Sequence, residues 1–270
     1  MERVTHDGRD TAYRISDRDG DGATVCCIHG SGGSRDIWKA QARVSDRFPV
    51  VALDLSGHGD SDDVDAPAGP ATLDAYADDV VAVAEATDAA VLCGNSLGGA
   101  VALWVALERE IALDGLVFAG TGAKLTVTVE LLDALATDFE RAIDLLHEAD
   151  RLFHDAPPEY AELSRAGMRD CGRAVTERDF RTCHAFDVRD RLGEISIPAL
   201  AVVGEHDTLT PAAYHDYLAT QIDGCERASV EAAAHLAMLE QPVAFNAALM
   251  AFLRRIDSCG ADNREADDYR

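Results

Sequence analysis

The chain has 270 residues, enough for one substantial hydrophobic core without a second independent domain. It carries 49 acidic residues and 24 basic ones, so its formal net charge is −25. Nucleic acids and anionic membranes are bound through cationic surfaces, so we expect neither as a partner.

The first residues and the cysteines bear on the compartment. No apolar run approaches the roughly 20 residues that cross a bilayer, and the charged start MERVTHDGRD lacks the apolar stretch of a signal peptide. The seven cysteines are odd in number and show no C-x-x-C spacing, which argues against a disulfide framework and against a zinc site. We therefore expect a cytoplasmic protein.

The excess of acidic residues also predicts how the stability of the protein depends on salt. Only Lys39 and Lys124 are lysines. Self-repulsion among so many carboxylates destabilises a compact chain in dilute buffer, and molar salt removes it by shortening the screening length to about 3 Å. The composition favours a halophilic protein over the alternative, an acidic mesophilic protein from an arginine-rich proteome.

The first part of the chain alternates apolar runs with helical patterns. Three short apolar runs bounded by turn residues predict strands at residues 11–16, 23–28 and 48–53. Apolar residues at helical spacing predict a helix over residues 73–85. The pattern then predicts a strand, a helix and a strand at residues 90–93, 97–108 and 113–119.

The second part resumes this alternation after an interruption. Residues 125–192 contain helical patterns and no clear strand, so we interpret them as a helical insertion. The acidic tail, residues 258–270, is expected to be disordered. Between them the pattern predicts strand, helix, strand and helix at residues 197–204, 212–221, 227–230 and 243–255.

This order predicts an α/β fold, with a mostly parallel sheet and helices on both faces. The core would comprise residues 1–124 and 193–257, and the insertion residues 125–192.

A serine between glycines lies where a predicted strand gives way to a predicted helix. The segment Gly94-Asn95-Ser96-Leu97-Gly98 has the form G-x-S-x-G. Glycines there allow a sharp reversal that leaves the hydroxyl of Ser96 exposed above the sheet edge, next to the N–H groups of the helix N-terminus. The pattern favours a nucleophile; the alternative is an ordinary glycine-rich packing turn.

Five motifs in order resemble those of the α/β-hydrolase fold superfamily. They are HGSGG at 29–33, DLSGHGDS at 54–61, GNSLGG at 94–99, GEHD at 204–207 and AHLAMLEQP at 234–242. The resemblance covers about residues 10–255 apart from the insertion, which lies where this superfamily places a helical cap. It is closest to small cap-bearing serine hydrolases, the enol-lactonase, carboxylesterase and carbon–carbon hydrolase branches.

The resemblance implies a catalytic triad. Its members would be Ser96 as nucleophile, Asp207 as acid and His235 as base, in the chain order serine, acid, histidine. Taken singly, Asp207 could equally be a loop-capping aspartate and His235 a partly buried surface histidine. Some family members carry the acid after the preceding strand, but residues 119–122 contain no carboxylate here.

The resemblance also assigns two oxyanion donors, the backbone N–H groups of Leu97 and Ser31. We expect His29 and His58 to support loops, and His206 to point away from the site. No cofactor is needed for acyl transfer. No metal site is predicted, because the nine histidines are scattered and no H-x-x-x-H run occurs.

A cap over the serine would close an apolar pocket suited to small or medium substrates. We expect a serine hydrolase that cleaves a small carboxylic ester or lactone through an acyl-enzyme on Ser96. Two alternatives stay open: a carbon–carbon hydrolase of a ring-fission diketone, and a ligand-binding protein of the same fold that does little chemistry. The oligomeric state is not predicted. Candidates to line the pocket are Trp38, Leu97, Leu125, Leu131 and Phe186, but for each of them alone plain core packing is the favoured interpretation.

Overall fold

A twisted eight-stranded sheet forms the centre of the molecule in the computed structural model, which describes residues 1–267 and the side chains of residues 1–258. Its strand order is β1-β2-β4-β3-β5-β6-β7-β8. β1 and β2 run antiparallel to their neighbours, and all other pairs are parallel. The strands are β1 Glu2–His6, β2 Arg9–Ser16, β3 Thr24–Ile28, β4 Val50–Leu53, β5 Ala89–Asn95, β6 Gly115–Ala119, β7 Ala199–Gly204 and β8 Cys225–Val230.

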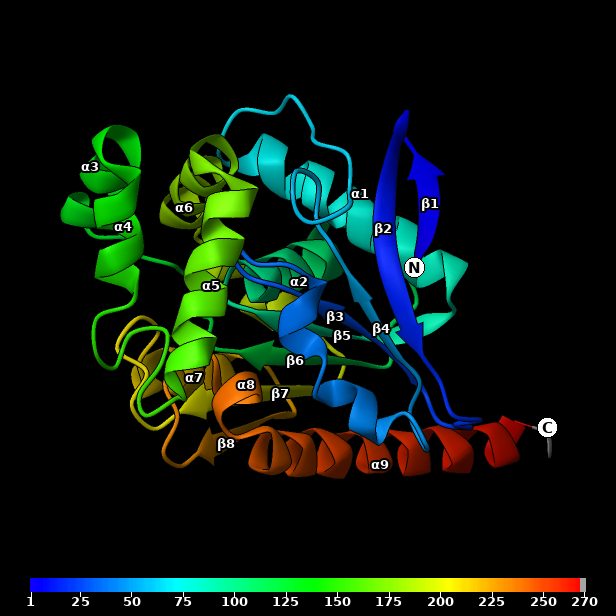
Figure 1. Ribbon diagram of the computed structural model, residues 1–270. Helices are drawn as coiled ribbons and strands as arrows, with labels where there is room; N and C mark the ends of the chain where they lie inside the picture. The colour runs from blue at the N-terminus through cyan, green and yellow to red at the C-terminus, as the bar shows by residue number, and fades with distance from the viewer. Residues whose placement is uncertain (268–270) are drawn as a thin grey trace.

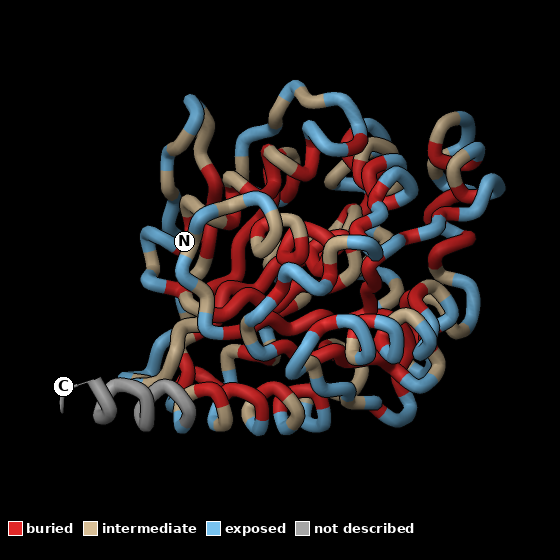
Figure 2. Tube along the Cα trace, turned by 180° about the vertical axis from the view of Figure 1, so that it is seen from behind, coloured by how far each residue is buried: buried red, intermediate tan, exposed pale blue. Residues whose placement is uncertain are grey.

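The central strands are apolar along their whole length because helices cover both faces of the sheet. Every residue of β4, β6 and β7 is buried, as expected for strands without a solvent face. Figure 1 shows α1 and α2 on one side of the sheet and α9 on the other. Figure 2 shows the same layering from behind, with buried residues along the strands and exposed ones on the outer turns of the helices. The predicted α/β fold is confirmed.

The helices of the core connect successive strands. Helix α1 spans Pro70–Ala86 and α2 spans Leu97–Glu108, and the two pack together over the sheet. Within the described residues, no helix combines the length and apolarity needed to span a bilayer. The remaining core helices are α7 Ala212–Gln221, α8 Ala237–Glu240 and α9 Pro242–Asp267, with short 3₁₀ turns η1 Arg35–Trp38, η2 Gln41–Val44 and η3 Arg189–Glu194.

A group of helices separates β6 from β7 and lies beside the sheet in Figure 1. Its two ends are joined by an antiparallel bridge between Lys124 and Asp187. Next to this bridge, the Val188 N–H donates to the Ala123 carbonyl at 2.8 Å. The group leaves and re-enters the core at one place, close to the predicted insertion limits of 125 and 192. Its helices are α3 Val129–Thr137, α4 Phe139–Leu146, α5 Pro158–Cys171 and α6 Arg173–Ala185.

Two elements differ from expectation at the ends of the chain. β1 was not predicted, because it is an edge strand with an exposed, polar sequence, ERVTH, and no hydrophobic alternation. The last helix does not end near Arg255: α9 continues to Asp267, so it overlaps the tail predicted to be disordered from residue 258. Residues 268–270 of that tail lie outside the described part of the chain.

The parallel register determines where the functional candidates lie. Ile28 of β3 pairs with Gly94 of β5, and Asn95 of β5 pairs with Ala119 of β6. The carboxyl ends of these strands therefore meet at one edge of the sheet, the usual position of ligand sites in open α/β folds.

Candidate active site

Ser96 occupies a strained turn between β5 and α2. Its φ of 54° and ψ of −118° lie in a region that residues with a side chain rarely adopt. Hydrogen bonds hold it there: its N–H donates to the Ala119 carbonyl at 3.0 Å, and its carbonyl accepts from Thr121 Oγ1 at 2.8 Å. The predicted reversal between strand and helix is present.

The glycines that flank Ser96 are required by close packing. A Cβ on Gly94 would overlap the backbone of Gly98, and a Cβ on Gly98 would overlap the backbone of Ile28 at the end of β3. Helix α2 can therefore start directly against the sheet only with glycine at these two positions. Close packing alone therefore explains why glycine occupies both positions of the motif, whatever reaction Ser96 takes part in.

His235 and Asp207 form a buried pair. His235 Nδ1 lies 2.9 Å from Asp207 Oδ2, and the two side chains are 4% and 0% exposed. Because an ionised carboxylate only accepts, Nδ1 carries the proton of the neutral imidazole. The loop after β7 orients the carboxylate, since the N–H groups of Leu209 and Thr210 donate to Asp207 Oδ1 at 2.9 and 2.8 Å.

The pKa of Asp207 is lowered from its ordinary value of 3.8. Burial by itself would raise this pKa, but the charge of His235 and the hydrogen bonds from His235 and Thr210 outweigh it. Asp207 is therefore ionised at neutral pH and stabilises a positive charge on His235.

One large cavity brings the serine and the histidine together. It has a volume of about 1300 Å³, and Ser31, Ser96 and His235 all line it. Asp207 is not among the lining residues; it lies behind His235. Of the five candidate lining side chains, Leu125 and Leu131 line the cavity. The other three, Trp38, Leu97 and Phe186, are buried in the core instead.

Two backbone N–H groups near Ser96 have no acceptor. Within the described residues, neither the Leu97 N–H nor the Ser31 N–H donates a hydrogen bond. The loop that carries Ser31 lies against the serine, since a Cβ on Gly30 would be 3.0 Å from Ser96 Cβ. Both groups are thus available to a ligand atom beside Ser96.

A buried aspartate from the helical segment between β6 and β7, residues 125–192, supports the loop that carries Ser31. Asp179 of α6 accepts from the Gly32 N–H at 3.2 Å through Oδ2, and the same oxygen lies 2.9 Å from His58 Nε2. Its other oxygen accepts from Tyr76 Oη at 2.7 Å. Asp179 is not among the predicted site residues, because nothing near it in the sequence distinguishes it from the many other acidic residues.

Two further polar residues were missed. Asn95 Nδ2 donates to the carbonyl of His235 at 3.3 Å and to that of Ala119 at 3.1 Å, which ties the serine turn to the histidine loop. Thr210 Oγ1 donates to Asp207 Oδ2 at 2.7 Å and lies 3.2 Å from His235 Nδ1. Asn95 lies within the GNSLGG motif and Thr210 lies three residues after the GEHD motif, and this proximity is the signal that could have found them.

Two other histidines of the motifs, His29 and His58, are buried and hydrogen-bonded within the loops, as expected. His29 supports a loop: its Nε2 accepts from the Leu55 N–H at 3.0 Å, and burial lowers its pKa to about 4. His58 is buried, and its Nε2 is hydrogen-bonded to Asp179. His206 stacks on His154, with the two rings nearly parallel.

The sequence matches that of known hydrolases. Residues 27–248 match the Alpha/beta hydrolase family. A 3-oxoadipate enol-lactonase 2 from Acinetobacter baylyi is 29% identical over 84% of this chain and 86% of its own. A pimeloyl-[acyl-carrier protein] methyl ester esterase from Neisseria meningitidis is 31% identical over 86% of this chain and 77% of its own. The solved structure of a thermophilic esterase has a TM-score of 0.82 and 32% identity, and covers 94% of this chain and 97% of its own.

Proposed function

Because the chain belongs to the alpha/beta hydrolase family and is a hydrolase, we propose that it cleaves a small carboxylic ester or lactone through an acyl-enzyme on Ser96. One observation carries this proposal: the buried pair of His235 and Asp207 opens onto the same cavity as the hydroxyl-bearing turn at Ser96. A serine hydroxyl is a weak nucleophile until a base takes its proton, and this arrangement supplies the base.

Each residue of the proposed triad has one role. Ser96 Oγ attacks the substrate carbonyl, and its proton passes to His235 Nε2, the nitrogen that Asp207 leaves free. His235 then gives the proton to the departing alcohol. Water repeats the cycle and releases the acid. Asp207 fixes the tautomer of the ring and stabilises the imidazolium, for which its lowered pKa is suited.

The negative oxygen of the tetrahedral intermediate is held by the N–H groups of Ser31 and Leu97. Their lack of acceptors among the described residues supports this role. A preorganised donor of this kind is worth about a hundred- to a thousandfold in rate.

The helical segment, residues 125–192, acts as a cap in this proposal. Leu125, Val127 and Leu131, at the start of this segment, contribute apolar walls to the cavity. Met168 of α5 and Phe180 of α6 contribute further apolar wall. At about 1300 Å³ the cavity exceeds the usual range of about 300–1,000 Å³ for small-molecule sites. A small or medium substrate fits it. The lactone in the name of one relative is of this class, whereas the methyl ester in the name of the other is carried on an acyl-carrier protein.

A fluorophosphonate probe tests the mechanism. The purified protein should be labelled stoichiometrically at Ser96, and Ser96→Ala should not be labelled. Turnover is then measured on p-nitrophenyl esters, lactones and ring-fission dienoates, at low and molar salt. Hydrolysis of dienoates alone would replace the proposal with a carbon–carbon hydrolase. Absence of labelling and of turnover would leave a binding protein of the same fold.

A further inference from the structure

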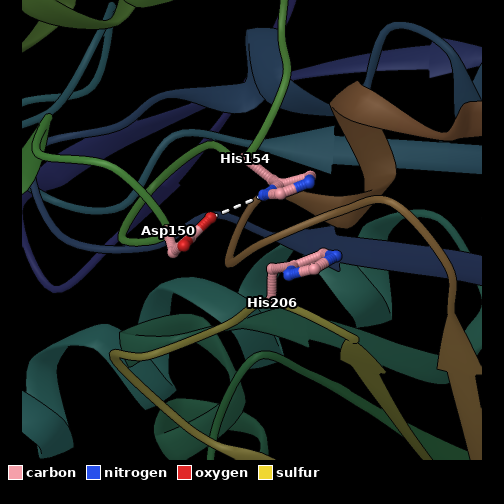
Figure 3. A group of neighbouring side chains, drawn as sticks. All are labelled: Asp150, His154 and His206. Carbon is pink, nitrogen blue, oxygen red and sulfur yellow. Dashed lines mark hydrogen bonds and ion pairs between the residues drawn. The ribbon is translucent and has the colours of Figure 1, made fainter.

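Two histidines and an aspartate form a cluster outside the proposed active site. Asp150, His154 and His206 each offer a ligand atom, and these atoms all lie within 4.8 Å of one another. Figure 3 shows the two imidazole rings stacked, with Asp150 facing His154. The ring centroids are 3.5 Å apart at an angle of 3°, and Asp150 Oδ1 lies 2.5 Å from His154 Nδ1.

Hydrogen bonds fix the backbone of each of these residues. The Asp150 carbonyl accepts from the Thr208 N–H at 3.0 Å, and the His154 N–H donates to Glu240 Oε1 at 2.8 Å. The His206 N–H donates to the Ala233 carbonyl at 2.9 Å. The cluster is therefore assembled by the fold, from two segments far apart in the sequence, and does not depend on a ligand to form.

The surroundings of the cluster attract cations. The hydrogen bond that His154 donates to Asp150 raises the pKa of His154, and the charges of Asp150, Glu240 and Asp155 add to this effect. Glu205 Oε2 lies 3.8 Å from His206 Nε2. No arginine or lysine forms an ion pair with these acidic side chains in the described part of the chain.

We propose that Asp150, His154 and His206 bind one divalent transition-metal ion of the Zn²⁺ type, through one carboxylate oxygen and two imidazole nitrogens. Two histidines and a carboxylate are a donor set that such ions prefer, and water completes the coordination. The ion replaces the proton between Asp150 and His154, so binding releases a proton when that pair is protonated.

The geometry needs only side-chain movement. Zn²⁺ bonds of about 2.0–2.1 Å place tetrahedral ligand atoms roughly 3.3 Å apart. The lone pairs of an imidazole lie in its ring plane, so the parallel rings must turn toward each other from the stack in Figure 3. The side chains of His154 and His206 are 30% and 36% exposed, which leaves room for that rotation.

A bound ion would join the helical segment to the loop of the proposed acid. His206 immediately precedes Asp207, and Thr208, which holds Asp150, immediately follows it. The carbonyls of Arg151 and Leu152 accept from the N–H groups of His235 and Leu236 at 3.2 and 3.0 Å. The ion therefore cross-links the two loops and stabilises the folded state, because it binds the folded chain and not the unfolded one.

Metal binding is measured directly, so the test does not depend on the proposed hydrolase activity. The full chain is freed of metal with a chelator and titrated with Zn²⁺ by calorimetry and with Co²⁺ by visible absorption. We expect one equivalent per chain and an unfolding midpoint that rises by a few degrees at roughly 100-fold excess over Kd. His154→Gln and His206→Gln should each weaken binding at least tenfold, and Asp150→Asn should weaken it by a similar factor.

His184→Gln is the matched control, because His184 is an exposed histidine of the helical segment outside the cluster. It should bind Zn²⁺ like the wild type. Circular dichroism of each variant establishes that it is folded before titration. Two results would overturn the proposal: no saturable binding by the wild type, or binding unchanged in both histidine variants, which would assign the ion to thiols such as Cys171 and Cys225.

Discussion

Ser96 combines backbone strain with a hydroxyl that the fold itself does not use. A positive φ costs a residue with a Cβ roughly 1–3 kcal/mol, and the hydrogen bonds to Ala119 and Thr121 keep the turn in place. Strain of this kind persists where the surrounding structure imposes it, and here it holds the hydroxyl at the edge of the cavity.

Replacing Ser96 by glycine should therefore stabilise the protein. We expect Ser96→Gly to raise the free energy of unfolding by about 1 kcal/mol, because glycine adopts a positive φ without strain. Denaturant unfolding measures the change. Ser96→Ala is the matched control, since it also removes the hydroxyl but keeps the Cβ and its strain. Equal stability of the two variants would contradict the role given to the backbone.

Asp207 should matter for rate far more than for substrate binding. We expect Asp207→Asn to lower kcat by about 10⁴-fold with a small change in KM, because the amide no longer holds His235 in the tautomer that accepts a proton. Steady-state kinetics on an ester that the wild type hydrolyses gives both constants. Thr210→Val removes one hydrogen bond to the same carboxylate and should cost much less. A drop below tenfold in Asp207→Asn would remove Asp207 from the mechanism.

At the scale of elements, helix α6 is joined to the core through a buried ion pair. Asp179 and His58 are both 0% exposed, and Asp179 also accepts from Tyr76 and from the loop that carries Ser31. Burial acts against both charges. Even so, the charge of Asp179 raises the pKa of His58 well above 6.5, and the charge of His58 lowers the pKa of Asp179 below 3.8. The helical segment and the proposed oxyanion loop are thus held by one carboxylate.

Removing one partner of this pair should be costly. We expect Asp179→Asn to lower the free energy of unfolding by about 3–5 kcal/mol, since it leaves His58 buried without its counter-charge. Chemical denaturation measures it. Asp63→Asn, which removes an exposed partner of Arg178, is the control and should cost less than about 1 kcal/mol. If the two variants lose the same stability, the buried pair does not hold α6.

The pair also predicts a pH dependence. A raised His58 pKa means that the folded state holds its proton more tightly than the unfolded state. The stabilisation is therefore complete below about 6.5 and is lost as pH rises through the higher folded value. Unfolding measured from pH 6 to pH 10 should show stability falling on the alkaline side. His58→Gln should lose this slope, and an unchanged slope would contradict a charged His58.

For the whole molecule, the net charge of −25 is the dominant property. Several ion pairs of the described residues involve exposed arginines and contribute little individually. With 49 acidic residues against 24 basic ones, many carboxylates have no counter-charge and repel one another in dilute buffer. Molar salt screens that repulsion, which is why the composition predicts a halophilic protein.

Salt should therefore stabilise this protein strongly. We expect the midpoint of thermal unfolding to rise by several degrees between about 0.1 M and 2 M KCl, as the screening length falls from about 10 Å to a few ångströms. Near pH 4.5, the isoelectric point, the same salt should have much less effect. A midpoint that does not change with KCl at neutral pH would fit an acidic mesophilic protein instead.

The sequence by itself determined the order of strands and helices, the α/β fold and the turn at Ser96. These features depend on local signals. Buried strands are continuous apolar runs, and in core helices the apolar residues recur at the helical period. The turn at Ser96 needs glycine at positions 94 and 98. The exposed edge strand β1 and the end of α9 at Asp267 lacked such signals, and for that reason they were missed or misplaced.

Outside the family motifs, only the tertiary structure decided which polar side chains meet. Asp179 and His58 are separated by 121 residues, yet they share one hydrogen bond in the core. Asp150 and His154 lie in a loop of the helical segment, and only the return of the chain through β7 brings His206 to them. No spacing in the sequence encodes such a contact, because it depends on how separate segments pack and not on the local preference of either.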